Sequence, residues 1–208
     1  MKPYLRLVYK CIYLGSKVFR KNYEFLSPTA VDTLIEDLVK QLRISDFEPQ
    51  VIVAIGTGGC YAGKQIAAAT NVMLDTIDIR QYTLNVLGVN LVYLPLVVTV
   101  FRYLGKMKEA RYIGGPVTDV GGKLVLLVDD DIEHGTTVAL AKRKLMEMGA
   151  AGIRTVVLSP NSLPGEVDFF PGSLYQVAPE VLFKKRHYGE TFRFKWPWEP
   201  ISPYHGQL

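Results

Sequence analysis

The fold is decided by residues 124–137, which read LVLLV-DDDIEH-GTT. The five apolar residues at the start are typical of a strand in a parallel sheet that is covered on both faces. Acidic residues then lead into a Gly-Thr-Thr turn, and residues 138–145 predict a helix directly after it. Such a turn at the carboxyl end of a strand is a common anion-binding arrangement, because the N–H groups of the first helical turn are open. The acids beside it favour a sugar phosphate with its metal, since carboxylates accept hydrogen bonds from ribose hydroxyls while the turn holds the phosphate.

The rest of the chain alternates helix and strand in the same way. Ser27-Pro28 predicts a helix start, and apolar residues follow at helical spacing at Val31, Leu34, Ile35, Leu38 and Leu42. Short apolar or alternating runs predict strands at 51–55, 76–82 and 153–158, and a second helix is expected through 66–69. This alternation indicates an α/β fold with a parallel twisted sheet flanked by helices.

Composition excludes several classes of protein. A hydrophobic content of 49% with 21% charged residues indicates a globular domain. The net charge of +4 comes from the N-terminus, where residues 1–23 hold six basic side chains and no acid, which leaves 18 basic against 20 acidic residues in the remainder. We therefore expect no nucleic-acid partner, which would need a basic face on the fold. Two cysteines make no disulfide framework, and a cytoplasmic location is the simplest expectation, with organelle targeting by residues 1–21 as the alternative.

One internal stretch is unusually apolar. No charged residue lies between Arg80 and Arg102, a length that could cross a bilayer. It contains Asn85, Asn90 and Pro95 and lies between two predicted strands, so we expect an apolar flap or an oligomer contact and not a membrane span.

The 125–137 segment resembles the phosphoribosyl-pyrophosphate (PRPP) motif of type I phosphoribosyltransferases. That motif has four apolar residues, two acids, two variable residues, a third acid, a small or polar residue and Gly-Thr-Thr, and this chain follows it as VLLV-DD-DI-E-H-GTT. The resemblance implies that Asp129 and Asp130 hold the ribose hydroxyls, directly or through a metal. It also implies that Glu133 is the catalytic acid or base near the purine imidazole ring, and that the segment Glu133, His134, Gly135, Thr136 and Thr137 wraps the 5′-phosphate.

A glycine run forms the second candidate site. Gly56-Thr57-Gly58-Gly59 follows the strand at 51–55, and in the family the loop at this place binds pyrophosphate. The resemblance thus assigns Thr57, Gly58 and Gly59 to pyrophosphate, although Thr57 stands where many purine members have a basic residue. A glycine-rich turn also serves plain packing of a strand against a helix, so this alternative stays open.

The C-terminal tail carries the third candidate site. Its sequence Phe192-Arg193-Phe194-Lys195-Trp196-Pro197-Trp198-Glu199 is similar to the end of the base-binding hood in xanthine-guanine phosphoribosyltransferases. There an aromatic residue four positions before the proline stacks on the purine, but here that position is Arg193. Base stacking could come from Phe192, Phe194 or the Arg193 guanidinium, and a Trp/Phe-rich core strand is the alternative. Glu199 matches an acid that, with Asp129 and Asp130, would hold the metal.

The resemblance implies a Mg²⁺-dependent purine salvage enzyme that transfers 5-phosphoribosyl from PRPP to a 6-oxopurine and releases pyrophosphate. The lysine that reads the 6-oxo group in purine members is missing from 158–162. A PRPP-binding regulatory protein, or a transferase for another acceptor, therefore remains as an alternative. We expect a basic N-terminal extension at 1–21, a phosphoribosyltransferase domain at 22–208 with its hood at approximately 165–208, and a homodimer or higher homo-oligomer.

Overall fold

The computed structural model describes residues 23–83, 85–86, 89–90, 108–132, 135–160, 167–174 and 193–198. Its helices are α2 (Pro28–Ile44), α3 (Gly56–Thr70) and α5 (Thr136–Glu147). Its strands are β1 (Tyr23–Phe25), β2 (Val51–Ile55), β3 (Leu74–Thr83), β4 (Asn85–Val86), β5 (Val89–Asn90), β6 (Lys108–Gly114), β7 (Leu124–Ile132), β8 (Gly152–Pro160) and β9 (Arg193–Lys195).

Five of these strands form the central sheet in the order β6-β3-β2-β7-β8. The neighbours β3, β2, β7 and β8 run parallel, whereas β6 pairs antiparallel with β3 at the edge. The expected α/β fold with a mostly parallel sheet is confirmed, and the antiparallel edge strand is an addition. The central strands β2 and β7 bring their carboxyl ends to one edge of the sheet, where the predicted PRPP motif lies.

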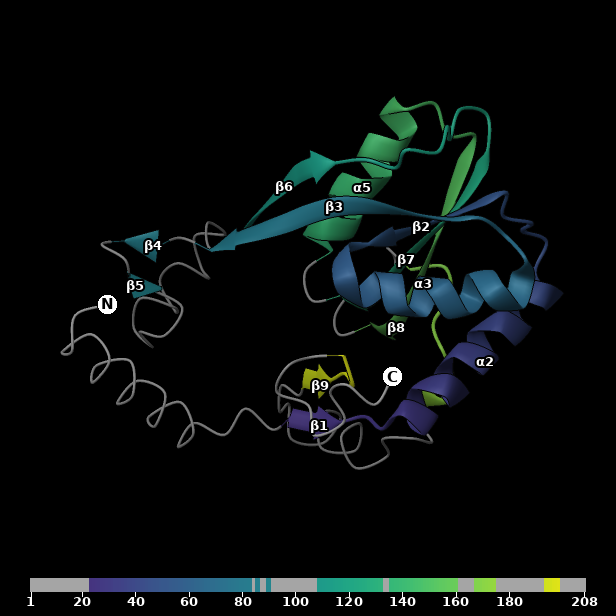
Figure 1. The fold of residues 1–208 in the computed structure, drawn as a ribbon, viewed down its shortest axis with the longest axis horizontal. Coiled ribbons are helices and arrows are strands. Elements are labelled where there is room, and N and C mark those ends of the chain that lie inside the picture. Colours follow the sequence, from purple (N-terminus) through teal and green to yellow (C-terminus); the bar gives the residue numbers. More distant parts are fainter. Residues whose placement is uncertain are drawn as a thin grey trace.

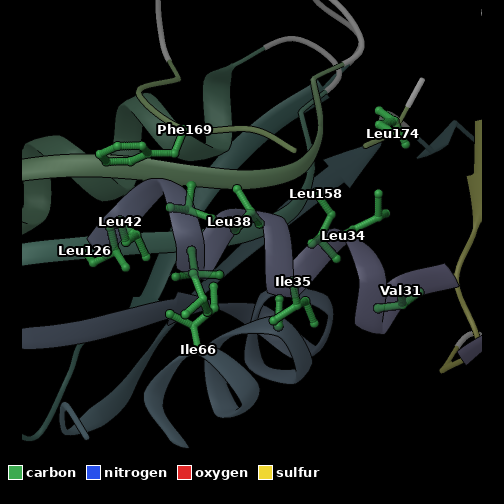
Figure 2. Close-up of a cluster of buried hydrophobic side chains, with 14 of the residues drawn as sticks. Val31, Leu34, Ile35, Leu38, Leu42, Ile66, Leu126, Leu158, Phe169 and Leu174 are labelled. Atoms are coloured by element: carbon green, nitrogen blue, oxygen red, sulfur yellow. The ribbon is translucent and has the colours of Figure 1, made fainter. Parts of the chain in front are cut away.

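Helices cover both faces of this sheet (Figure 1). On one face α5 packs through Val138, Ala141 and Leu145 on alternate residues of the strands, such as Val53 and Leu127. On the other face α2 and α3 enclose a core with Ile52 and Leu126, part of which is drawn in Figure 2. Burial on both faces explains why β2 is apolar at every position.

Helix α2 forms as the sequence predicts. The Ser27 hydroxyl accepts a hydrogen bond from the Ala30 N–H at 3.2 Å, and Pro28 occupies the first turn. The five predicted apolar positions are buried, and Val39 joins them. The cap satisfies one of the open N–H groups of the first turn, and the buried apolar residues pack the helix into the core that it shares with α3.

Two boundaries differ from the sequence prediction. Strand β7 continues through the acids to Ile132, because β8 runs beside it and pairs Asp131 with Ser159 and Ile132 with Pro160. Helix α3 begins at Gly56, so the glycine run is its first turn and not a separate loop. The predicted strand end at residue 128 and the predicted loop at 56–59 are both wrong.

The described parts of the C-terminal tail pack on the α2 face. Strand β9 pairs in parallel with β1, with Tyr23 opposite Arg193 and Phe25 opposite Lys195, and Phe194, Trp196, Phe169 and Leu174 belong to the core cluster. The division at residue 22 and the hood boundary near 165 remain predictions.

The uncharged stretch at 81–101 lies largely outside the described residues. Its described part includes the end of β3 and the short antiparallel pair of β4 and β5. Among the described residues, no helix combines the length and the apolar character needed to cross a bilayer.

Candidate functional site

The acid pair lies where β7 emerges from the centre of the sheet. Asp129 is buried, with 8% of its surface exposed, and its carboxylate accepts a hydrogen bond from the Asp130 N–H at 2.9 Å. Burial and then the nearby charge of Asp130 raise the pKa of Asp129 well above the usual range. A buried acid with a second acid beside it favours a bound cation or hydroxyl donors, which would offset the cost of burying charge.

Asp130 is held on the α3 side of β7. A Cβ atom added to Gly58 would lie 1.9 Å from Asp130 Oδ2, so a larger residue there would force the carboxylate or α3 to move. The Trp198 indole donates a hydrogen bond to the same oxygen at 3.3 Å. Burial raises the pKa of Asp130, and the hydrogen bonds from Asp129 and Trp198 lower it less than burial raises it.

The Gly-Thr-Thr turn begins helix α5. Gly135 is its N-cap with φ of 71°, in the left-handed region that favours glycine, and no side chain caps the helix. Thr136 is exposed, and the Thr137 hydroxyl accepts a hydrogen bond from Gln81 Nε2 at 2.8 Å. The open N–H groups of this helix end could bind a phosphate, and Gln81 ties it to β3.

The glycine run has a packing role that the family resemblance does not reveal. A Cβ on Gly59 would lie 2.4 Å from the Val128 carbonyl oxygen, and Gly58 faces Asp130. Both glycines therefore permit close contact between α3 and β7. The assignment of these residues to pyrophosphate stays a prediction, and the exposed Thr57 is the best placed of the three.

Thr57 opens onto a cleft between α3 and β3. The cleft has a volume of about 770 Å³. Its basic side chains are Lys64 on α3 and Arg80 on β3, and Arg80 pairs with Asp78 at 3.1 Å. Trp198 lines the same cleft and also donates to Asp130, so the indole contacts both the cleft and this acid. Lys64 and Arg80 therefore bring positive charge to a cleft that the uncharged Thr57 also lines.

The aromatic residues of the tail form a stacked series. Trp198 lies on Tyr61 with ring centroids 4.5 Å apart and on Trp196 with centroids 5.2 Å apart, and the planes of the two indoles are parallel to within 1°. Phe194 contacts Trp196 at 6.1 Å and is only 6% exposed. As placed, the Phe194 ring packs in the core, which matches the alternative of a core strand, and stacking on a base would require it to be uncovered.

Several predicted site residues cannot be placed. Glu133, His134, Phe192 and Glu199 lie outside the described residues, as does the side chain of Arg193. Among the residues that the structure does describe, no cluster of three His, Cys, Asp or Glu side chains could hold a metal. Asp129 and Asp130 are thus the described part of the predicted metal site.

Three contacts of the site were missed from the sequence. They are the Trp198 indole on Asp130, the Tyr61 ring under Trp198, and the Gln81 amide on Thr137. The Trp-Pro-Trp run was a signal for the first, but it gave no partner, because Trp198 and Asp130 are 68 residues apart.

Comparison with known proteins agrees with this arrangement. Residues 24–166 match the model of a family described as the phosphoribosyl transferase domain. The sequence matches none of the curated proteins.

Solved structures show the same fold at low sequence identity. A purine phosphoribosyltransferase from Pyrococcus horikoshii is 18% identical with a TM-score of 0.58, over 86% of this chain and 96% of that one. A hypothetical protein from Neisseria gonorrhoeae with bound ppGpp is 14% identical with a TM-score of 0.60, over 88% and 92%. A hypoxanthine phosphoribosyltransferase from Staphylococcus aureus is 17% identical with a TM-score of 0.50, over 70% and 73%.

Proposed function

The chain belongs to the phosphoribosyl transferase domain family, and from that membership we propose that it transfers the 5-phosphoribosyl group of PRPP to N9 of a 6-oxopurine and releases pyrophosphate. One observation carries the proposal. The central strand β7 delivers the buried Asp129 and the half-buried Asp130 to the carboxyl edge of the sheet, and the uncapped N-terminus of α5 at Gly135 follows five residues after Asp130.

Each part of the site has a place in this reaction. Asp129 and Asp130 would accept hydrogen bonds from the ribose hydroxyls, and the N–H groups at Gly135, Thr136 and Thr137 would hold the 5′-phosphate. These contacts fix the sugar while positive charge grows on its ring in an oxocarbenium-like transition state. Fixed donors and acceptors of this kind stabilise developing charge without having to reorganise.

The leaving pyrophosphate would lie toward α3. Thr57 with its hydroxyl, and Lys64 and Arg80 in the adjoining cleft, offer donors and positive charge on that side. Lys64 would thereby compensate for the threonine at the position that is basic in many purine members. Glu133, as the resemblance implies, would accept or return a proton at the purine imidazole ring.

The acid pair also fits Mg²⁺. This ion is typically bound by one or two carboxylates together with substrate phosphates, and a cation would offset the raised pKa of Asp129. Asp129, Asp130 and, by resemblance, Glu199 would hold it. Bound there, Mg²⁺ would neutralise charge on the pyrophosphate.

A purine is the acceptor that we propose. The tail resembles the base-binding hood of xanthine-guanine enzymes, and two structural neighbours are named for purine and hypoxanthine. Because Phe194 is buried, we propose Phe192 or Arg193 as the residue that stacks on the purine.

The test is a panel of acceptors. Purified protein is incubated with PRPP and Mg²⁺ and with guanine, xanthine, hypoxanthine, adenine, uracil or orotate, and nucleotide and pyrophosphate are measured. We expect product with at least one 6-oxopurine. Product with another base only would overturn the acceptor, and PRPP binding without product from any base would support the regulatory alternative.

A further inference from the structure

The Trp198 indole touches the site without belonging to the PRPP motif. It is in the turn that follows β9, and its Nε1 donates to Asp130 Oδ2 at 3.3 Å. Hydrogen bonds to a charged acceptor are among the stronger ones in proteins. The indole is thus placed to fix the rotamer of the second acid.

Asp130 is also restricted by helix α3. The first turn of α3 approaches so closely that any Cβ on Gly58 would overlap the carboxylate. Helix α3 and the Trp198 indole therefore both approach Oδ2 of this carboxylate. A carboxylate has about four acceptor sites, so capacity remains for ribose hydroxyls.

The indole itself is fixed by its ring faces. Tyr61 of α3 lies on Trp198 at 4.5 Å, and Trp196 lies parallel to it at 5.2 Å. Trp196 is 2% exposed and belongs to the α2-face core. The stack connects the tail, α3 and the core to one carboxylate.

We propose that Trp198 is a positioning residue for ribose binding, which holds Asp130 through its indole N–H and so makes the affinity for PRPP depend on docking of the C-terminal tail. This inference rests on the proposed function.

The experiment compares two matched variants. Trp198→Phe keeps an aromatic ring between Tyr61 and Trp196 but removes the N–H donor, whereas Trp196→Phe alters the same stack and leaves that donor in place. PRPP affinity is measured by calorimetry with Mg²⁺, and the Tm of each variant checks the fold. We expect Trp198→Phe to weaken PRPP binding about 10-fold, the scale of one hydrogen bond to a charged group, and Trp196→Phe to change it less than about 2-fold.

Fluorescence gives a second reading that does not depend on activity. The chain has two tryptophans, so Trp196→Phe leaves Trp198 as the only indole. We expect its emission to change on addition of PRPP, and to change without any ligand when Asp130→Asn is added. Unchanged emission in both cases would contradict the contact between the Trp198 indole and Asp130 on which the proposal rests.

The outcomes separate the two proposals. If the wild-type protein binds no PRPP, the proposed function fails and this inference fails with it. If the wild type binds PRPP and Trp198→Phe binds it equally well, or if both Phe variants lose the same affinity, only the positioning role of Trp198 is overturned.

Discussion

At the scale of single residues, Asp129 shows a conflict between stability and function. Its pKa is raised by burial and by Asp130, so the folded protein holds the Asp129 proton more tightly than the unfolded chain does. The contribution of Asp129 to stability is therefore most favourable below the ordinary value of 3.8, and it is lost as the pH rises through the raised folded pKa. Under the proposed function, the ligand-free protein carries this cost, and ribose hydroxyls or a cation would offset it.

Asp129→Asn should reverse that cost. Asparagine keeps an oxygen that can accept from the Asp130 N–H but has no charge to bury. We expect the free energy of unfolding in urea at pH 7 to rise and the PRPP affinity to fall at least about 10-fold. A variant that is less stable than the wild type at pH 7 would contradict the assigned cause.

Gly58 is a second residue whose role can be tested alone. Gly58→Ala places a methyl group against Asp130 Oδ2, so the carboxylate or the helix must move. We expect a loss of stability of about 1–3 kcal/mol, the usual range for overpacking, and weaker PRPP binding. Gly114→Ala is the control, because a Cβ there meets nothing within 4 Å, and both are compared by urea unfolding and calorimetry.

At the scale of elements, α2 is tied to the described loop 167–174 by a carboxylate. Asp37 accepts a hydrogen bond from the Ser173 N–H at 2.8 Å, and Gln41 on the same helix donates to the Phe170 carbonyl at 3.0 Å. Burial on its own raises the pKa of Asp37, but the hydrogen bonds donated to its carboxylate, led by that of Ser173 and including those of Gln41 and Gly172, outweigh burial and the pKa is lowered. The contribution to stability is present above pH 3.8 and is lost as the pH falls through the lower folded value.

Asp37→Ala should expose that dependence. At pH 7 we expect the variant to lose about 1 kcal/mol, the scale of one hydrogen bond between half-buried groups. The difference from the wild type should shrink below pH 3.8. Urea unfolding between pH 3 and 7 measures this difference in the free energy of unfolding, and Asp32→Ala at an exposed position of the same helix is the control. A difference that does not depend on pH would contradict a role for the charge of Asp37.

The elements also show what sequence could and could not predict. The spacing of Val31, Leu34 and Leu38 and the apolar run of β2 depend on local periodicity, and both elements were predicted. The extension of β7 to Ile132 depends on its partner β8, and the start of α3 at Gly56 depends on contact with β7. Such contacts join segments that are far apart in the chain, so no local sequence pattern predicts them.

At the scale of the whole molecule, the two ends of the described chain meet. Pairing of β1 with β9 predicts that residues 1–21 can be removed while Tyr23–Phe25 cannot. We expect deletion of 1–21 to leave PRPP affinity within about 2-fold. Deletion of 1–25 should loosen the tail, lower the affinity and shift tryptophan emission to the red.

Calorimetry and emission spectra of the two truncated proteins check this prediction. Circular dichroism shows whether the central sheet survives in both. Equal PRPP affinity in the two proteins would mean that β1 does not support the tail, and loss of folding on deletion of 1–21 would make that segment part of the core.

The parallel pairing of β1 with β9 also sets an order of events during synthesis. A ribosome adds roughly 5–20 residues per second, so Tyr23 would wait about 10–30 s for its partner Arg193, 170 positions later. The sheet from β2 to β8 and its two helical layers can assemble within that time, because all of their residues precede 161. A nascent chain would then present Asp129 and Asp130 before the indole that contacts Asp130 has docked, and the site would acquire its final form only after the sheet had been made.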